Sequence, residues 1–368
     1  MVFLAKTVKS ELVHHLESKL PQPAIVKLPE STEFSVTVFD FMAFARKVPV
    51  KAAKLKTFRE YAECLLKIIY KAVGCCERID IVFDIYRERS IKEIERSRRS
   101  KKNALKMGEP QDDTPLPIDM DTYWASSQNK VRLQSYVIDW IMRNSTTFIS
   151  ARDIYLGGSH KEDPNKCYVI RNESINEDIS LKSDLEEADD RMLLHVSHIV
   201  AVSKARRVVI CSTDTDVFAN ALYHHYNCWQ SNGLKELWIL YGVGKTERYI
   251  PLHCFTSDYL LADSVLSTIP AIHCLTGCDT TSKISTKQKA IKVAEACAAD
   301  YLMDFGKHPL TEEMERHVEM YLVRTLGSDL HTMDELRFFQ YHHKKITSFQ
   351  ALAPTSSTVR LYIKRSYL

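Results

Sequence analysis

Seven acidic residues, spread over more than 200 positions, stand at or near the ends of apolar stretches. They are Asp40, Asp84, Glu187, Asp189, Asp214, Asp216 and Asp279. A carboxylate is costly to bury unless it is paired or binds a cation, so apolar runs that end in Asp predict one shared edge of a parallel sheet. Carboxylates that converge there would repel one another. Mg²⁺ or Mn²⁺ prefers oxygen ligands and would remove that repulsion, so the pattern predicts a divalent metal site.

Each of these acids also has a simpler structural interpretation. Asp214 or Asp216, in the segment VVICSTDTD, would suit the N-cap of a following helix. Glu187 and Asp189 fall in the expected first turns of a helix, where the macrodipole stabilises negative charge. The other three acids could each begin a turn or cap a helix. The set is therefore more informative than any one member.

The second feature with chemical potential is a basic stretch over residues 86–106. It holds nine Lys or Arg against three Glu, which is a local excess of six (9 − 3) in a chain of net charge +3. A solvated helix face would explain such a run, but this density also fits contacts with a nucleic-acid backbone. The expected contact residues, here and in a later Lys-rich stretch, are Arg96, Lys101, Lys102, Lys283, Lys287 and Lys289.

Two other motifs are rejected. The segment 242–246, GVGKT, resembles the end of a phosphate-binding loop, but the Gly that the pattern requires is Ile239. His273, Cys274 and Cys278 resemble half of a zinc site, and no second half follows.

The whole-chain properties set wide bounds. The 368 residues are 45% hydrophobic and 26% charged, which allows a sizeable core. The ten cysteines lack the regular spacing of a disulfide framework and are typical of the reduced thiols of an intracellular protein. No signal peptide or membrane span is expected. Cytosol or nucleus is left, and a nucleic-acid partner favours the nucleus.

The expected elements alternate between strands and helices, which predicts an α/β fold with a mostly parallel sheet. The strands are 36–39, 79–83, 152–156 and 207–211, with a hairpin at 236–241 and 247–252. The helices are 53–73, 129–142 and 217–225, and one opened by a capping box at Ser183 and Glu186. Three regions are expected: residues 1–32 as helix and linker, 33–290 as the main domain with an insertion at 86–145, and 291–368 as a helical extension.

In order and spacing, these motifs resemble the flap endonuclease (XPG-type) branch of the PIN-like nucleases, over about residues 35–290. The shared sequence runs through VFD, Glu-Ala-acid, Asp-x-Asp and Gly-Cys-Asp. The segments EEADDRMLLH, STDTDVF and AIHCLTGCDTTS are still more similar to a group of largely uncharacterised invertebrate proteins with a PIN-like domain. An origin of that group in mobile elements is one interpretation.

The resemblance implies a PIN-like fold and a nuclease that uses two Mg²⁺ or Mn²⁺ ions. It implies that the seven acids hold the metal ions, and that Lys92 with Arg98 or Arg99 stabilises charge on the scissile phosphate. DNA is favoured over RNA as the substrate, with no membrane partner.

The chain departs from the family in one functional segment. Flap nucleases continue after Gly-Cys-Asp into a Gly-x-Gly backbone that grips duplex DNA, whereas the stretch SKISTKQKAIKVA has no Gly. One alternative is therefore a catalytically inactive nucleic-acid-binding or scaffold protein of the same fold. Another is a phosphatase or other phosphotransfer enzyme, which the long basic stretch disfavours.

Overall fold

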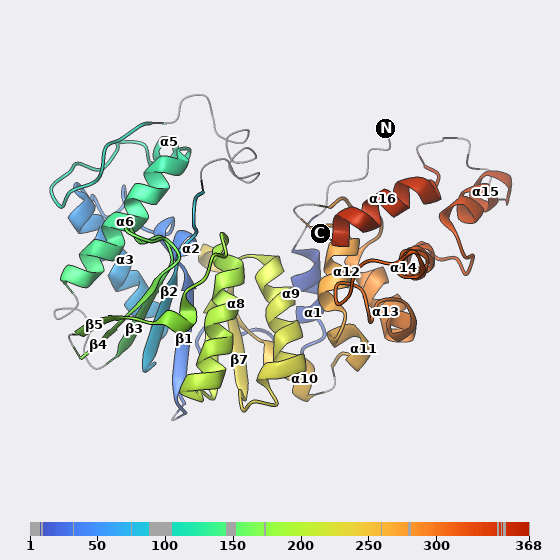
Figure 1. Cartoon of the computed structure of the whole chain (residues 1–368), viewed down its shortest axis with the longest axis horizontal. Helices are drawn as coiled ribbons and strands as arrows, with labels where there is room; N and C mark the ends of the chain where they lie inside the picture. Colours follow the sequence, from blue (N-terminus) through green and yellow to red (C-terminus); the bar gives the residue numbers. More distant parts are fainter. Residues whose placement is uncertain are drawn as a thin grey trace. The chain divides into compact units, whose positions relative to one another are not determined.

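The computed structural model describes residues 8, 10–31, 33–74, 76–87, 105–144, 152–172, 174–258, 260–278, 281–343, 346, 348 and 351–367. The chain has an α/β fold with a mostly parallel central sheet and flanking helices (Figure 1). It divides into two compact units, which are described separately below. The sheet unit contains Leu28–Thr213 and Asn232–Glu247, and the helical unit contains Met1–Lys27, Asp214–Ser231 and Arg248–Leu368.

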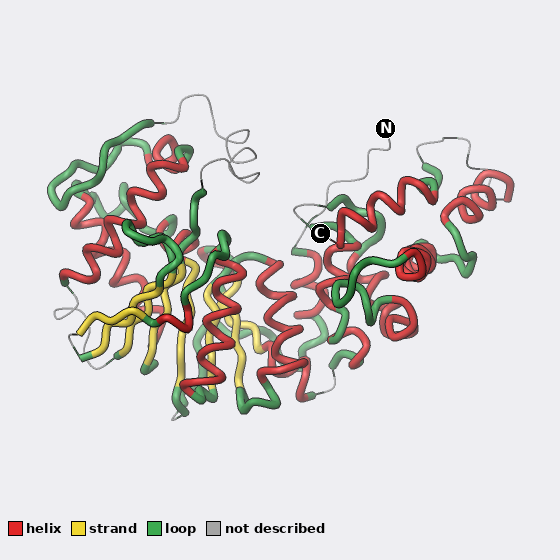
Figure 2. Tube along the Cα trace, in the orientation of Figure 1, coloured by secondary structure: helices red, strands yellow, loops and turns green. Residues whose placement is uncertain are grey.

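Seven strands of the sheet unit lie in the order β5-β4-β3-β2-β1-β6-β7. Figure 2 shows the strands in yellow. Strands β3, β2, β1, β6 and β7 run parallel to one another, whereas β4 is antiparallel to β3 and β5 is antiparallel to β4. The bounds are β1 Ser35–Asp40, β2 Arg78–Val82, β3 Asp153–Gly157, β4 Cys167–Arg171, β5 Ser174–Glu177, β6 Arg207–Cys211 and β7 Glu236–Tyr241.

The central strands are buried along nearly their whole length, which explains their unbroken apolar sequences. Asp40 of β1 lies opposite Val82 of β2, and Phe39 lies opposite Cys211 of β6, so the three strands end at one edge. From β1 the chain adds β2 and β3 on one side, and it later adds β6 and β7 on the other. The strand order thus reverses between β1 and β6, the kind of position where open α/β sheets bind ligands.

Short and long helices complete the sheet unit. Thr57 caps the long helix α3, and α8 packs against β1 and β2 (Figure 1). The helices are α2 Phe41–Ala45, α3 Phe58–Val73, α5 Met120–Trp124, α6 Ser127–Arg143, η1 Ile179–Leu181, α8 Ala188–His198, η2 Ile199–Ser203 and η4 Gly244–Thr246.

The helical unit is built around α13, which packs against α1, α11, α12 and α14. Its strand β8, Arg248–Pro251, meets the N-terminal segment through a bridge between Tyr249 and Ile25. The helices are α1 Glu11–Glu17, α9 Thr215–His224, η3 His225–Trp229, α10 Leu252–Ser257, α11 Asp263–Leu266, α12 Ile269–Leu275, α13 Lys287–Tyr301, α14 Glu312–Thr325, α15 Met333–His343 and α16 Ser356–Tyr367. Within the described ranges, no helix is both long and apolar enough to cross a bilayer.

The structure confirms the four single strands and the helices at 129–142 and 217–225, with small shifts of their ends. Two helix starts are corrected. The helix expected from residue 53 begins at Phe58, and the capping box at Ser183 does not form. Instead, the Ser183 hydroxyl accepts a hydrogen bond from Leu185 N, and the helix begins five residues later at Ala188.

Other expectations meet the structure differently. Strands β4 and β5 and helix α5 were not anticipated, because they are short and have no clear periodicity. The expected boundaries at 33 and 290 do not coincide with the two units, since residues 214–231 and 248–290 group with the C-terminal helices. The expected basic helix lies mostly outside the described residues, because 88–104 are not among them.

Candidate active site

The end of β1 places the first predicted acid at the carboxyl edge of the sheet. Asp40 is the last residue of this strand and also the N-cap of α2. Its side chain accepts a hydrogen bond of 2.8 Å from Met42 N. The carboxylate is half-buried, so the capping interpretation holds for Asp40 while the side chain stays at the edge where ligands bind.

The second acid joins the end of β2 to the start of α8. Asp84 stands two residues beyond β2, and its Oδ1 accepts a 3.0 Å hydrogen bond from Ala188 N, the first residue of the helix. One residue further, Ile85 N donates to Glu186 O at 2.8 Å. Segments that are more than 100 positions apart in the sequence are therefore fixed side by side at this edge.

Glu187 and Asp189 come to the same edge through this junction. Glu187 is the N-cap residue of α8, Asp189 lies in its first turn, and both are half-buried. The preceding loop is held by the fully buried Arg191, whose Nη2 donates to Ser183 O and Leu185 O at 3.0 and 2.7 Å. The helix starts end-on to Asp84, which is the arrangement that would allow residues i and i+2 to serve one site.

A cleft of about 720 Å³ in the sheet unit reaches Ile85 and Tyr86, the residues that follow Asp84. The Tyr86 hydroxyl donates to Asp84 Oδ2 at 3.3 Å, so the ring connects the carboxylate with the cleft. Both acidic and basic side chains line the cleft. Among them, Asp112 accepts a 3.0 Å hydrogen bond from Arg143. The volume is in the range that accommodates small ligands or one part of a larger one.

The acids of the TDTD segment belong to the helical unit. Asp214 is the third residue after β6 and caps α9, with its Oδ1 accepting a 2.9 Å bond from Asp216 N. Asp216 Oδ1 lies 2.6 Å from His273 Nε2, and His273 Nδ1 lies 3.0 Å from Lys287 Nζ. Burial lowers the pKa of Lys287 to about 8, in opposition to nearby acidic groups that raise it.

The segment that follows His273 is also tightly bonded. The Thr281 hydroxyl donates to Cys274 O at 2.6 Å and accepts from Cys278 N at 3.0 Å. A hydrogen bond with the Cys278 side chain, together with burial, raises the pKa of the Cys274 thiol. Asp279, the last predicted acid, lies outside the described residues.

The predicted cationic contacts are largely outside the described residues or have other partners. Lys92, Arg96, Arg98, Arg99, Lys101 and Lys102 are outside them. Lys283 pairs with Glu11 at 2.9 Å, and Lys289 is exposed. Lys287 is only 1% exposed and its ammonium group bonds internally, so it does not offer the exposed charge that a phosphate contact requires. The expectation for Lys287 is therefore replaced by an internal role.

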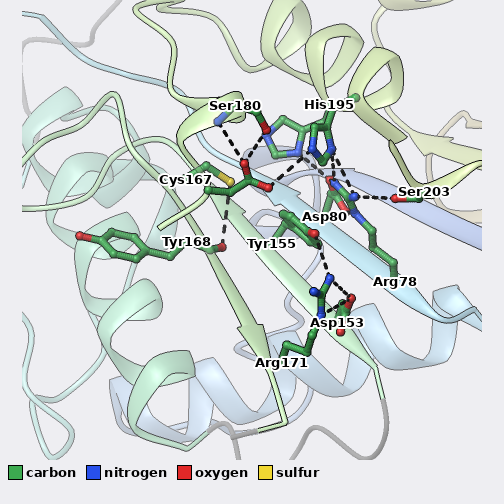
Figure 3. Close-up of polar contacts among 12 residues, drawn as sticks. Arg78, Asp80, Asp153, Tyr155, Cys167, Tyr168, Arg171, Ser180, His195 and Ser203 are labelled. Atoms are coloured by element: carbon green, nitrogen blue, oxygen red, sulfur yellow. Dashed lines mark hydrogen bonds and ion pairs between the residues drawn. The ribbon is translucent and has the colours of Figure 1, made fainter. Parts of the chain in front are cut away.

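A buried ion cluster, not anticipated from the sequence, joins β2 to α8 inside the sheet unit (Figure 3). Arg78 and Asp80, two residues apart on β2, form a bidentate pair with distances of 2.6 and 2.7 Å. Asp80 also bonds His195 Nδ1 of α8 at 2.6 Å, and the Arg78 guanidinium stacks 3.4 Å from the Tyr155 ring centre. The Arg-x-Asp spacing was the available signal, because i and i+2 share one face of a strand.

The Asp80 carboxylate stays ionised despite complete burial. Burial by itself would raise its pKa, but the charge of Arg78 and the hydrogen bonds from His195 and Arg78 outweigh burial and lower the pKa. The cluster pins the C-terminal half of α8, where His195 lies, to β2. It therefore holds the helix that Glu187 caps against the sheet rather than contributing chemistry of its own.

The chemistry of the acids fits a hard divalent cation, because all seven offer carboxylate oxygens. Among the residues that the structure describes, however, no group of three or more His, Cys, Asp or Glu side chains is arranged to hold a metal ion. Mg²⁺ usually keeps several waters and binds through one or two carboxylates, so its binding does not require a complete protein cage.

Comparison with known proteins assigns the chain to no family. The sequence matches no protein-family model, and no curated protein matches it.

Proposed function

We propose that this chain is a metal-dependent nuclease of PIN-like fold that hydrolyses phosphodiester bonds, with DNA preferred over RNA. The observation that carries the proposal is the carboxyl edge of β1 and β2. Asp40 ends one strand, Asp84 follows the other and bonds the start of α8, and these strands lie beside the point where the strand order reverses. That position is where open α/β sheets bind ligands.

The proposed ligands of two Mg²⁺ or Mn²⁺ ions are the acids of the sequence pattern. In the sheet unit these are Asp84, Glu187 and Asp189, which bind directly or through water, with Asp40 beside them. In the helical unit they are Asp214 and Asp216, and Asp279 is the one proposed ligand outside the described residues. The ions would supply an activated water and stabilise the leaving oxygen. Lys92 and Arg98 or Arg99 would stabilise charge on the phosphate.

The cleft beside Asp84 supports a substrate larger than a single phosphate. Tyr86 links the carboxylate to a space of about 720 Å³, and an aromatic ring there could stack on a base next to the scissile bond. The basic stretch that follows Tyr86 in the sequence would supply contacts with the phosphate backbone.

The test is a cleavage assay with labelled single-stranded, duplex and 5′-flap DNA and with RNA, in Mn²⁺ or in EDTA. We expect metal-dependent cutting that Asp84→Asn and Asp214→Asn each reduce on the order of 10²-fold or more, because charge stabilisation at the reacting phosphate is lost. Asp153→Asn is the matched control, since Asp153 begins β3 at the opposite end of the strand and bonds Arg171.

Two results would contradict this proposal. Cutting that survives in both active-site variants would exclude these acids from the reaction. Tight binding of nucleic acid without cutting of any substrate would favour the inactive scaffold.

A further inference from the structure

The imidazole of His273 lies between an acid and a cation in the helical unit. Its Nε2 is 2.6 Å from Asp216 Oδ1, and its Nδ1 is 3.0 Å from Lys287 Nζ. His273 and Lys287 are buried, with 3% and 1% of their surface exposed, whereas the Asp216 side chain is 35% exposed. The row of three groups thus leads from the interior to a carboxylate that solvent can reach.

The donors and acceptors of this row fix the proton on His273. An ammonium group has three protons to donate and accepts none. Lys287 donates them to His273 Nδ1 and, at 2.7 Å each, to His273 O and Gly277 O. Nδ1 must therefore accept, so the ring proton of neutral His273 is on Nε2 and is donated to Asp216.

The three groups come from three helices, and the middle one contacts the other two. Asp216 lies in the first turn of α9, His273 in α12, and Lys287 begins α13. Helix α12 packs against both of the others. The backbone of Asp216 is held as well, because its N–H donates to Asp214 Oδ1 at 2.9 Å. This carboxylate is thus fixed through both its main chain and one side-chain oxygen.

We propose that His273 is a positioning residue for Asp216 and that Lys287 holds it in this role by fixing the Nε2–H tautomer. The inference rests on the proposed function in so far as Asp216 binds a metal ion. Hydrogen-bond partners of ligating groups orient those groups, and their loss typically lowers metal affinity about 10- to 100-fold. Among the described residues, the Lys287 ammonium bonds a ring nitrogen and two carbonyl oxygens. The role of this buried lysine is then to determine which nitrogen of His273 donates.

The first test compares two amides at position 273 in the full chain by calorimetric titration with Mn²⁺. The amide of Gln reaches about as far as Nε2 and can donate to Asp216, whereas that of Asn ends near the position of Nδ1. We expect His273→Gln to retain affinity within a few fold of wild type and His273→Asn to lose about 10- to 100-fold. Equal affinities in the two variants, whether both are retained or both lost, would overturn the proposal.

The second test needs no metal. Long-range ¹H–¹⁵N correlation spectra of histidine-labelled protein report the tautomer, and His273→Gln identifies the signal by its disappearance. We expect Nε2–H in wild type and a mixture in Lys287→Met, a substitution of similar size whose fold is checked by circular dichroism. An Nδ1–H ring in wild type, or an unchanged spectrum in Lys287→Met, would contradict the inference.

The variant Asp216→Asn distinguishes a failure of the proposed metal site from a failure of the positioning role of His273. If this variant binds Mn²⁺ as tightly as wild type, Asp216 is not a ligand and the proposed function fails at this residue. If it loses affinity while His273→Asn does not, the metal assignment stands and only the positioning role is wrong.

Discussion

At the scale of single residues, Asp80 has the clearest energetic role. It is fully buried, accepts two hydrogen bonds from Arg78 and bonds His195. Removing one partner of a buried ion pair leaves an uncompensated charge, which costs about 3–5 kcal/mol. We therefore expect Asp80→Asn to lower the free energy of unfolding by that amount in urea denaturation.

The matched control for this prediction is the exposed pair of Arg171 with Asp153. Its side chains are 53% and 29% exposed, so Asp153→Asn should cost less than about 1 kcal/mol. A loss of similar size in the two variants would show that burial does not determine the effect.

The stabilisation from Asp80 should also depend on pH in a defined direction. Its pKa in the folded protein is below the ordinary value of 3.8. A carboxyl group with a lowered pKa stabilises the fold above its unfolded pKa and loses that contribution as the pH falls through the folded pKa. The difference in unfolding free energy between wild type and Asp80→Asn should therefore be constant near neutral pH and shrink below about pH 3.8.

At the scale of elements, the contact between the end of β3 and α8 depends on a missing side chain. A Cβ on Gly157 would lie 2.4 Å from His195 Nε2, and His195 is held on its other nitrogen by Asp80. Overpacking of this kind typically costs about 1–3 kcal/mol. We expect Gly157→Ala to destabilise the protein by that amount, measured by thermal unfolding.

Gly108 provides the comparison for that substitution. It is exposed, and an added Cβ would meet nothing within 4 Å. Gly108→Ala should therefore change stability by no more than about 0.5 kcal/mol. If Gly157→Ala were equally neutral, the ring of His195 would have room to move, and the rigid junction of β3, β2 and α8 would be disproved.

The elements also show what could be predicted from the sequence. Apolar runs and helical periodicity located β1, β2, β3 and β6, because parallel strands buried on both faces have a continuous apolar signal. The same signal predicted that Asp40 and Asp84 would share an edge, which the parallel register of β1 and β2 confirms. Local pattern was enough where burial alone decides the structure.

The hydrogen-bond partners of the acids could not be predicted from the local sequence pattern. The bond of Asp84 to Ala188 N, and that of Asp216 to His273, join residues 104 and 57 positions apart. Lys287 was expected to contact nucleic acid because its neighbours are basic, yet it is buried among carbonyl oxygens. Composition cannot distinguish an exposed lysine from one whose helix directs it inward. The prediction that a capping box at Ser183 opens the helix was wrong for a related reason. The helix begins at Ala188, whose N–H donates to Asp84, and this tertiary contact cannot be predicted from local sequence.

At the scale of the whole molecule, the proposed function predicts a link between metal and stability. The proposed carboxylate ligands would repel one another without a cation, and a ligand that binds only the folded state stabilises that state. At a free Mn²⁺ concentration of 100 times Kd, the stabilisation is about 2.7 kcal/mol. We expect a rise of several degrees in the melting temperature with Mn²⁺, relative to NaCl of matched ionic strength.

The variants decide whether that rise comes from the proposed site. Asp84→Asn and Asp216→Asn should each reduce it, because each removes a negative charge from the ligand set. Asp153→Asn should leave it intact, since Asp153 begins β3 and pairs with Arg171. A melting temperature that Mn²⁺ does not change in wild type would count against a metal site at the carboxyl edge. An equal rise in all four proteins would point to ions that bind elsewhere, and the acids at the sheet edge would then be caps and helix-start residues alone.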